Sequence, residues 1–160
     1  PHFAALIDPD DPGFLNPPDM PEAVAAFCRR TGQAVPPTRA AMVRAILESL
    51  ALKYRFVLEE LRAVLGHPIE RIHVIGGGAR NALLCRLTAE ATGLPVVAGP
   101  AEATAVGNIL VQAMALGLVS SPAGMRRIIR ESFPLETYRP SGPPAEWDAA
   151  YDRFRQILTS

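Results

Sequence analysis

The sequence has few cysteines and few aromatic residues, no excess of charge of either sign, and no long hydrophobic run. Its two cysteines, Cys28 and Cys85, stand among apolar neighbours in stretches with helical spacing. We expect both to be buried small hydrophobic residues in a reducing compartment, because this placement favours neither a disulfide framework nor a metal pair.

The balance of charge excludes several kinds of partner. Lys+Arg and Asp+Glu both number 16, which gives a formal net charge of +0, and no basic run is present. Nucleic acids and acidic membrane surfaces are bound through basic patches, so neither is expected as a partner. The sequence contains no signal-peptide pattern and no apolar run long enough to cross a bilayer. These absences predict a cytoplasmic protein.

What is present indicates a folded α/β chain in which helices dominate. The hydrophobic content of 49% and charged content of 20% are typical of a globular protein with one ordinary core. Capping residues and apolar spacing predict the elements along the chain. Helices are expected over 20–30, 38–66, 81–92, 100–117, 121–130 and 147–158, and strands over 72–75 and 94–99.

Two stretches stand out from this pattern. Residues 1–18 are extended and rich in proline, yet they carry apolar residues, which predicts a segment that lies across a folded surface and leaves open a fragment of a longer protein. Those residues are Phe3, Leu6, Ile7, Phe14 and Leu15. The helix over 38–66 is apolar around more than one face, so we expect it to be a central scaffold.

A triple glycine is the most informative motif. The apolar strand over 72–75 runs into Gly76, Gly77 and Gly78, and Asn81 opens the next helix. Glycine loses more conformational freedom on folding than any other residue, so three in succession require an explanation. Two explanations are open: either the glycines only make a tight turn, or a ligand approaches their backbone next to the helix N-terminus.

The residues alone leave these alternatives open, although two ligand motifs fit poorly. A dinucleotide fingerprint needs a third glycine where Asn81 stands, and an acid after the next strand, which ends without one. A P-loop needs Gly-Lys-Ser/Thr after the glycines, and that is missing too. The remaining ligand hypothesis is a nucleotide that lies across the glycines, with Asn81 bonding its base or ribose.

At this point a resemblance becomes specific. The stretch "HVIGGGARNALLCRLTAEATGLPVVAGPAEATAVGNILVQAMALG" resembles the adenosine-motif region of the FGGY carbohydrate kinases. "LIDPDDPGFLNPPDMPEAV" and "ESLALKYRFVLEEL" resemble the same family, so the match covers nearly the whole chain and is weakest after Ser120. "VVAGPAEATAVGNILVQ" is similar to the branch that phosphorylates rhamnulose.

The resemblance implies a fold, a cofactor and a place in a larger enzyme. Residues 1–160 would be the C-terminal part of the second domain, a partial actin-like (ribonuclease H-like) ATPase domain with a short, incomplete sheet. It would comprise an extended segment (1–18), an adenosine-binding core (19–120) and a helical segment (121–160). The full-length protein would transfer the γ-phosphoryl group of ATP to a primary hydroxyl of L-rhamnulose or a similar ketose, with Mg²⁺.

The resemblance also assigns the residues. Gly77 and Gly78 would be the main ATP contacts, Gly76 would support them, and Asn81 would lie beside the adenine. The family's catalytic Asp, phosphate loops and magnesium site precede the region that this chain resembles, so no catalytic or metal residue is expected and the chain alone is predicted to be inactive. The alternative is a non-catalytic nucleotide-binding or interaction module.

Other residues are expected to be structural. The acidic turn that holds Asp8, Asp10 and Asp11 is interpreted as solvated, His73 as a buried hydrogen-bonded residue, and Trp147 as the anchor of the last helix. Arg80 is expected to be an exposed residue of the turn, although it could reach a phosphate. An actin-like domain lacking its earlier strands would expose a sheet edge and the apolar face of its long helix, so the chain is predicted to self-associate.

Overall fold

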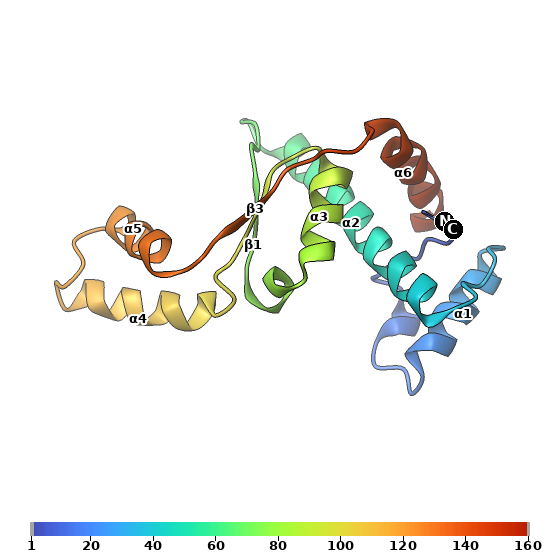
Figure 1. Ribbon diagram of the computed structural model, residues 1–160, viewed down its shortest axis with the longest axis horizontal. Helices are drawn as coiled ribbons and strands as arrows, with labels where there is room; N and C mark the ends of the chain where they lie inside the picture. The colour runs from blue at the N-terminus through green and yellow to red at the C-terminus, as the bar shows by residue number, and fades with distance from the viewer. Residues whose placement is uncertain (1, 160) are drawn as a thin grey trace.

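The computed structural model describes residues 2–159, which form an elongated α/β arrangement dominated by helices (Figure 1). The helices are α1 (Met20–Arg30), α2 (Arg39–Val64), α3 (Ala82–Thr92), α4 (Ala103–Ala115), α5 (Pro122–Ser132) and α6 (Pro144–Leu158). The strands are β1 (Ile72–Val74), β2 (Val96–Ala98) and β3 (Glu136–Tyr138), and two short 3-10 helices are η1 (Pro12–Phe14) and η2 (Gly76–Arg80). Every predicted helix and both predicted strands are present, so the expected α/β class is confirmed.

Local capping residues set several helix boundaries. The Asp19 carboxylate accepts a 3.1 Å hydrogen bond from Glu22 N–H at the start of α1, and the Thr38 hydroxyl accepts one of the same length from Ala41 N–H at the start of α2. Each bond satisfies an amide that has no partner within the helix. These ends were predicted from the sequence because a cap acts on residues only three positions away.

The sheet has the order β1-β2-β3. β1 runs parallel to β2 with Ile72 opposite Val96, while β3 runs antiparallel to β2 with Glu136 opposite Ala98. β3 was not predicted, because "ETY" is short, exposed and bounded by prolines, and its pairing with β2 alone makes it a strand. Among the described residues, β1 is therefore an edge strand with one side unpaired, as expected.

The body of the molecule is built around α2, α3 and α6, with the N-terminal segment laid among them (Figure 1). Trp147 is buried and meets the Phe3 ring edge-on, at 4.8 Å between centroids, which confirms Trp147 as the anchor of the last helix. The principal core comprises Phe3, Leu6, Ala51, Leu52, Leu87, Ala91, Trp147, Ala150, Tyr151 and Phe154. Both ends of the chain thus contribute to one core.

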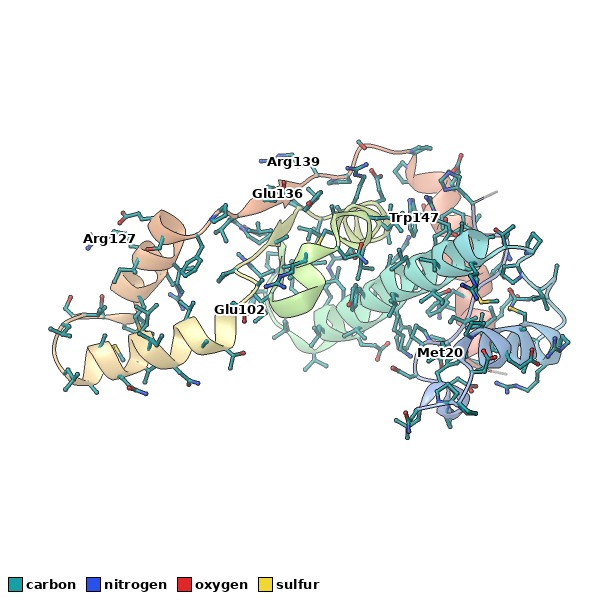
Figure 2. All side chains as sticks on the ribbon, turned by 60° about the horizontal axis from the view of Figure 1, so that its bottom comes forward. Met20, Glu102, Arg127, Glu136, Arg139 and Trp147 are labelled. Atoms are coloured by element: carbon teal, nitrogen blue, oxygen red, sulfur yellow. The ribbon has the colours of Figure 1, made fainter. Side chains whose placement is uncertain are left out.

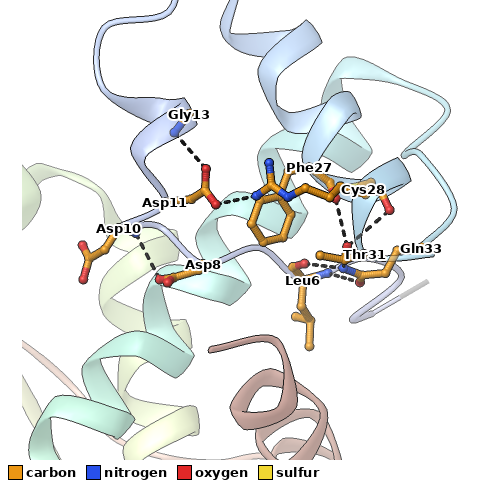
Figure 3. A network of polar contacts seen from close by, with 10 residues as sticks. Leu6, Asp8, Asp10, Asp11, Gly13, Phe27, Cys28, Thr31 and Gln33 are labelled. Carbon is orange, nitrogen blue, oxygen red and sulfur yellow. Dashed lines mark hydrogen bonds and ion pairs between the residues drawn. The ribbon is translucent and has the colours of Figure 1, made fainter. Parts of the chain in front are cut away.

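The backbone of the buried N-terminal segment is hydrogen-bonded by side chains and not by a neighbouring strand. The backbone N–H of Phe3 donates to Glu48 Oε2 at 2.8 Å, and that of Ile7 donates to Ser49 Oγ at 2.9 Å. Gln33 bonds both the N–H and the carbonyl of Leu6, as Figure 3 shows. Buried backbone groups need such partners. The prediction that this segment lies across a folded surface is confirmed.

Two details differ from expectation. His73 is exposed, because it lies on the face of β1 opposite Ile72 and Val74, and those two residues pack on the side that α3 covers. The interpretation of His73 as a buried residue was therefore wrong. Leu15, expected among the packed apolar residues, is 86% exposed on the loop that follows η1.

The long helix α2 packs against other helices on one side only. It packs against α1, α3 and α6, and its buried side is partly small and polar. A second row of apolar side chains, which we call the α2 stripe, remains exposed as predicted for a chain without its earlier strands. The stripe consists of Val43, Tyr54, Val57, Leu61 and Val64.

Helices α4 and α5 form an arm that projects from the sheet, away from the body (Figures 1 and 2). The arm is joined to β2 at one end and to β3 at the other. Leu110 is the buried residue of α4, whereas Ile109, Val111 and Leu116 are exposed. The arm meets the body at the carboxyl end of β2, beside the triple glycine.

Candidate functional site

Gly76 is required by the turn that follows β1. Its φ of +72° lies in the left-handed region, where side chains are rarely accommodated. Its N–H donates to Pro100 O at 3.3 Å, which ties the turn to the loop after β2. The hypothesis of a tight turn therefore accounts for Gly76.

Gly77 and Gly78 are different. Neither has a positive φ, and both are exposed within η2. A methyl group added at Gly77 would meet no described atom within 4 Å, and one at Gly78 would reach Val74 Cγ1 at 3.4 Å, an ordinary contact. Because the folded chain has room for side chains at both positions, it gives no reason for two more glycines. Their bare backbone forms an open surface that a flat ligand can approach.

Asn81 caps helix α3. Its Oδ1 accepts a 3.0 Å hydrogen bond from Leu84 N–H, and its own N–H donates to Gly78 O at 3.1 Å. Sequence reasoning missed this cap, although an Asn directly before a helical pattern is a recognised signal for one. The amide nitrogen is a separate donor, so a contact from Asn81 to a nucleotide stays a prediction.

The loop after β2 meets the glycine turn at the carboxyl ends of the two parallel strands. Gly99 N–H donates to Val74 O at 2.9 Å. Arg80 and Glu102 form an ion pair at 2.7 Å across the junction, and both side chains are about 70% exposed, so the pair contributes little to stability. The expectation that Arg80 is exposed is confirmed. In open parallel sheets this edge is where ligands bind.

A hollow of about 430 Å³ lies against this junction. It extends from η2, across the loop after β2, to the residues that lead into β3, and it is within the size range of small-molecule sites. Its walls are formed by Ala79, Arg80, Ala98, Gly99, Pro100, Ala101, Glu102, Phe133, Pro134 and Glu136. Sequence reasoning did not include the last three, because β3, which brings them here, was not predicted.

The floor beneath the glycines is apolar. Cys85 is fully buried in a cluster with Ala89, Val96 and Ala98, and its thiol lies 3.7 Å from Gly78 O. Burial raises the pKa of the Cys85 thiol, which keeps it protonated and able to donate. Cys28 is fully buried as well, so the prediction that both cysteines are buried is confirmed.

The acidic turn near the N-terminus is paired with cations. Asp8 and Asp10 bond Lys53 at 3.0 and 2.9 Å, and Asp11 bonds Arg30, as Figure 3 shows in part. A larger hollow of about 690 Å³ borders this network and is lined by residues of the N-terminal segment, α1 and α6, among others. Within residues 2–159, no group of three or more His, Cys, Asp or Glu side chains is arranged to hold a metal ion.

Comparisons with known proteins show the family of the chain. The model of the C-terminal domain of the FGGY family of carbohydrate kinases matches residues 1–116, so the chain belongs to the FGGY family. It is 57% identical over 156 residues to a rhamnulokinase of Bacteroides thetaiotaomicron, and 46% identical over 159 residues to one of Pectobacterium carotovorum. Each match includes 98% of this chain and 32% of the relative. The chain thus spans about a third of the length of these relatives.

Solved structures confirm the fold. The xylulose kinase of Rhodospirillum rubrum superposes with a TM-score of 0.61 at 26% identity, over 80% of this chain and 26% of that kinase. A xylulose kinase of Brucella ovis superposes with a TM-score of 0.59 at 23% identity, over the same shares. The helix-rich partial actin-like domain predicted from the sequence is therefore correct. No helix within residues 2–159 is both long and apolar enough to cross a membrane.

Proposed function

We propose that this chain is the adenosine-binding portion of an ATP-dependent sugar kinase. One observation carries the proposal: Gly77 and Gly78 present bare backbone at the carboxyl ends of two parallel strands, and the fold itself does not require glycine at either position. A nucleotide that lies flat against that backbone supplies the reason, because any side chain there would occupy its place.

The site residues have distinct roles in this proposal. Gly77 and Gly78 face the adenosine, Gly76 shapes the turn, and Asn81 offers its amide nitrogen to the base or ribose while its oxygen caps α3. Residues 19–120 form the adenosine-binding core. Phosphoryl transfer requires a general base and Mg²⁺, and we place both on the part of the enzyme that precedes this chain.

The names of the relatives support a substrate. Proteins named rhamnulokinase match 98% of this chain, and so include most of residues 117–160, which lie beyond the family-wide domain model. We therefore propose L-rhamnulose or a similar ketose, phosphorylated at a primary hydroxyl. The two buried free thiols favour a reducing compartment, and we propose the cytoplasm.

The test is phosphorylation by the full-length polypeptide that carries this chain. We expect ADP release in a coupled assay with Mg-ATP and L-rhamnulose, and much slower release with D-xylulose. A full-length protein that binds ATP without turning over any ketose would support the non-catalytic module instead. A protein that does not bind ATP would overturn the proposal.

We further propose that the isolated chain self-associates. The edge of β1 has no partner strand among the described residues, and the α2 stripe offers exposed apolar side chains. Both features lie on a chain that spans about a third of its relatives, so a second copy would bury what the rest of the enzyme covers.

A further inference from the structure

The residues that lead from α5 into β3 pack closely against the loop after β2, next to the turn of the triple glycine. The pairing of Glu136 with Ala98 places Glu136 at the carboxyl end of β2. Gly99 has a φ of +109°, and a methyl group added there would come within 3.3 Å of both Leu135 Cδ2 and Pro134 O. Gly99 therefore allows the backbone of Pro134 and Leu135 to cross close above it.

This close crossing forms the second wall of the hollow of about 430 Å³. One wall is Ala79 and Arg80, the residues that directly follow the triple glycine; the other is Phe133, Pro134 and Glu136. Figure 2 shows Glu102 at the start of the arm and Glu136 on β3, both where the arm joins the body. The second wall lies outside residues 1–116, the part that the family-wide domain model matches.

The lining suits a flat, largely apolar group with a hydrogen-bond donor on its edge. Phe133 and Pro134 supply apolar surface, and the Glu136 carboxylate supplies acceptors. Tyr138 donates its hydroxyl to Glu136 Oε2, which fixes the carboxylate without saturating it, since a carboxylate has about four acceptor positions. Of the charged residues that line the hollow, Arg80 and Glu102 pair with each other, which leaves the negative charge of Glu136, so a neutral base is favoured at this end over a triphosphate.

From this arrangement we infer that Phe133 and Glu136 form a base-selecting wall of the nucleotide site, with the Glu136 carboxylate accepting a hydrogen bond from the exocyclic amine of adenine. The inference rests on the proposed function, because it assigns the base of the nucleotide that lies on Gly77 and Gly78. The C-terminal segment thereby determines which purine the kinase accepts.

Nucleotide binding to the full-length polypeptide tests this inference by comparing ATP with ITP, whose base carries a carbonyl in place of the amine. Wild type should bind ATP more tightly than ITP, because that carbonyl faces a carboxylate. Glu136→Gln should raise the Kd for ATP roughly tenfold, the scale of one hydrogen bond to a charged group, and should reduce the preference for ATP, since an amide can donate as well as accept. Glu131→Gln, on the exposed side of α5, is the matched control and should change neither value.

A second variant covers the case in which Glu136→Gln disturbs β3. Phe133→Ala should weaken ATP and ITP binding alike, with an unchanged circular dichroism spectrum. Unchanged Kd values in both variants would overturn the inference, as would a wild type that binds ATP and ITP equally. If the wild type bound neither nucleotide, the proposed function would fail first.

Discussion

The hydroxyl of Tyr151 on α6 donates a 2.7 Å hydrogen bond to Glu59 Oε2 on α2, 92 residues earlier in the chain. The Arg55 guanidinium lies 4.3 Å from the centroid of the Tyr151 ring and bonds the other Glu59 oxygen at 3.2 Å. Arg55 also pairs with Asp148 at 2.8 Å. Burial, and then the bond to Glu59, raise the pKa of the Tyr151 hydroxyl, which keeps it a donor. This group fastens the last helix to the scaffold.

Tyr151→Phe should therefore lower the free energy of unfolding by about 1 kcal/mol, the usual net contribution of one hydrogen bond. Urea titration followed by circular dichroism measures the change. Tyr54→Phe, on the exposed α2 stripe, is the control and should remain close to wild type. Equal losses in the two variants would show that the bond to Glu59 contributes nothing specific.

The three glycines should respond differently to substitution. Gly78→Val in the full-length polypeptide should weaken ATP binding by ~1–3 kcal/mol, roughly ten- to a hundred-fold in Kd, because its side chain would fill the space that we propose for the ribose. Gly77→Ala should weaken binding without destabilising the fold, since the methyl group meets no described atom within 4 Å. Gly76→Ala should instead destabilise the turn by about 1–2 kcal/mol through left-handed strain.

Calorimetric titration with ATP and thermal unfolding separate these effects. An ATP Kd equal to wild type in correctly folded Gly78→Val and Gly77→Ala would mean that the glycines form only a turn.

Glu90 should make stability depend on pH. Burial raises the pKa of its carboxyl. Three hydrogen bonds outweigh this effect and hold the pKa below its ordinary value of 4.5. One comes from Gly142 N–H at 2.7 Å, and two come from Ser141, through its Oγ at 2.8 Å and its N–H at 3.0 Å. A lowered pKa in the folded state means that the unfolded chain takes up the proton first as pH falls. The stabilisation is thus fully present above pH 4.5 and is lost as pH falls through the lower folded value.

Urea titrations of wild type and Glu90→Gln at several pH values between 7 and 3 measure this contribution. The difference in unfolding free energy between the two proteins should be constant near neutral pH and should shrink in acid, while the other carboxyl groups cancel. A difference that stays constant over the whole range would contradict the assignment.

The isolated chain should self-associate at micromolar concentration and show no turnover of L-rhamnulose with Mg-ATP. Light scattering measures the first property and a coupled assay the second. Leu61→Lys places a charge in the α2 stripe and should reduce association, whereas Leu15→Lys, on a more exposed but isolated residue, should not. A monomeric wild type would mean that the β1 edge and the α2 stripe do not attract a second copy.

Sequence alone determined the local features of this protein. Helix starts at Asp19 and Thr38 were readable because a cap bonds an amide three residues away. The strand before Gly76 was readable because its apolar run ends at a glycine cluster. The family was recognisable because the motif around the glycines is contiguous in the chain.

The tertiary structure decided everything that depends on distant partners. It made residues 136–138 a strand by pairing them with β2, exposed His73 on the open face of that sheet, and brought Phe133 and Glu136 to the glycine junction. It also distinguished Gly76, which the turn requires, from Gly77, where a side chain would fit, because the room at Gly77 depends on atoms from other elements. Local patterns carry information over a few residues, whereas these contacts join positions tens of residues apart, so only the folded chain defines them.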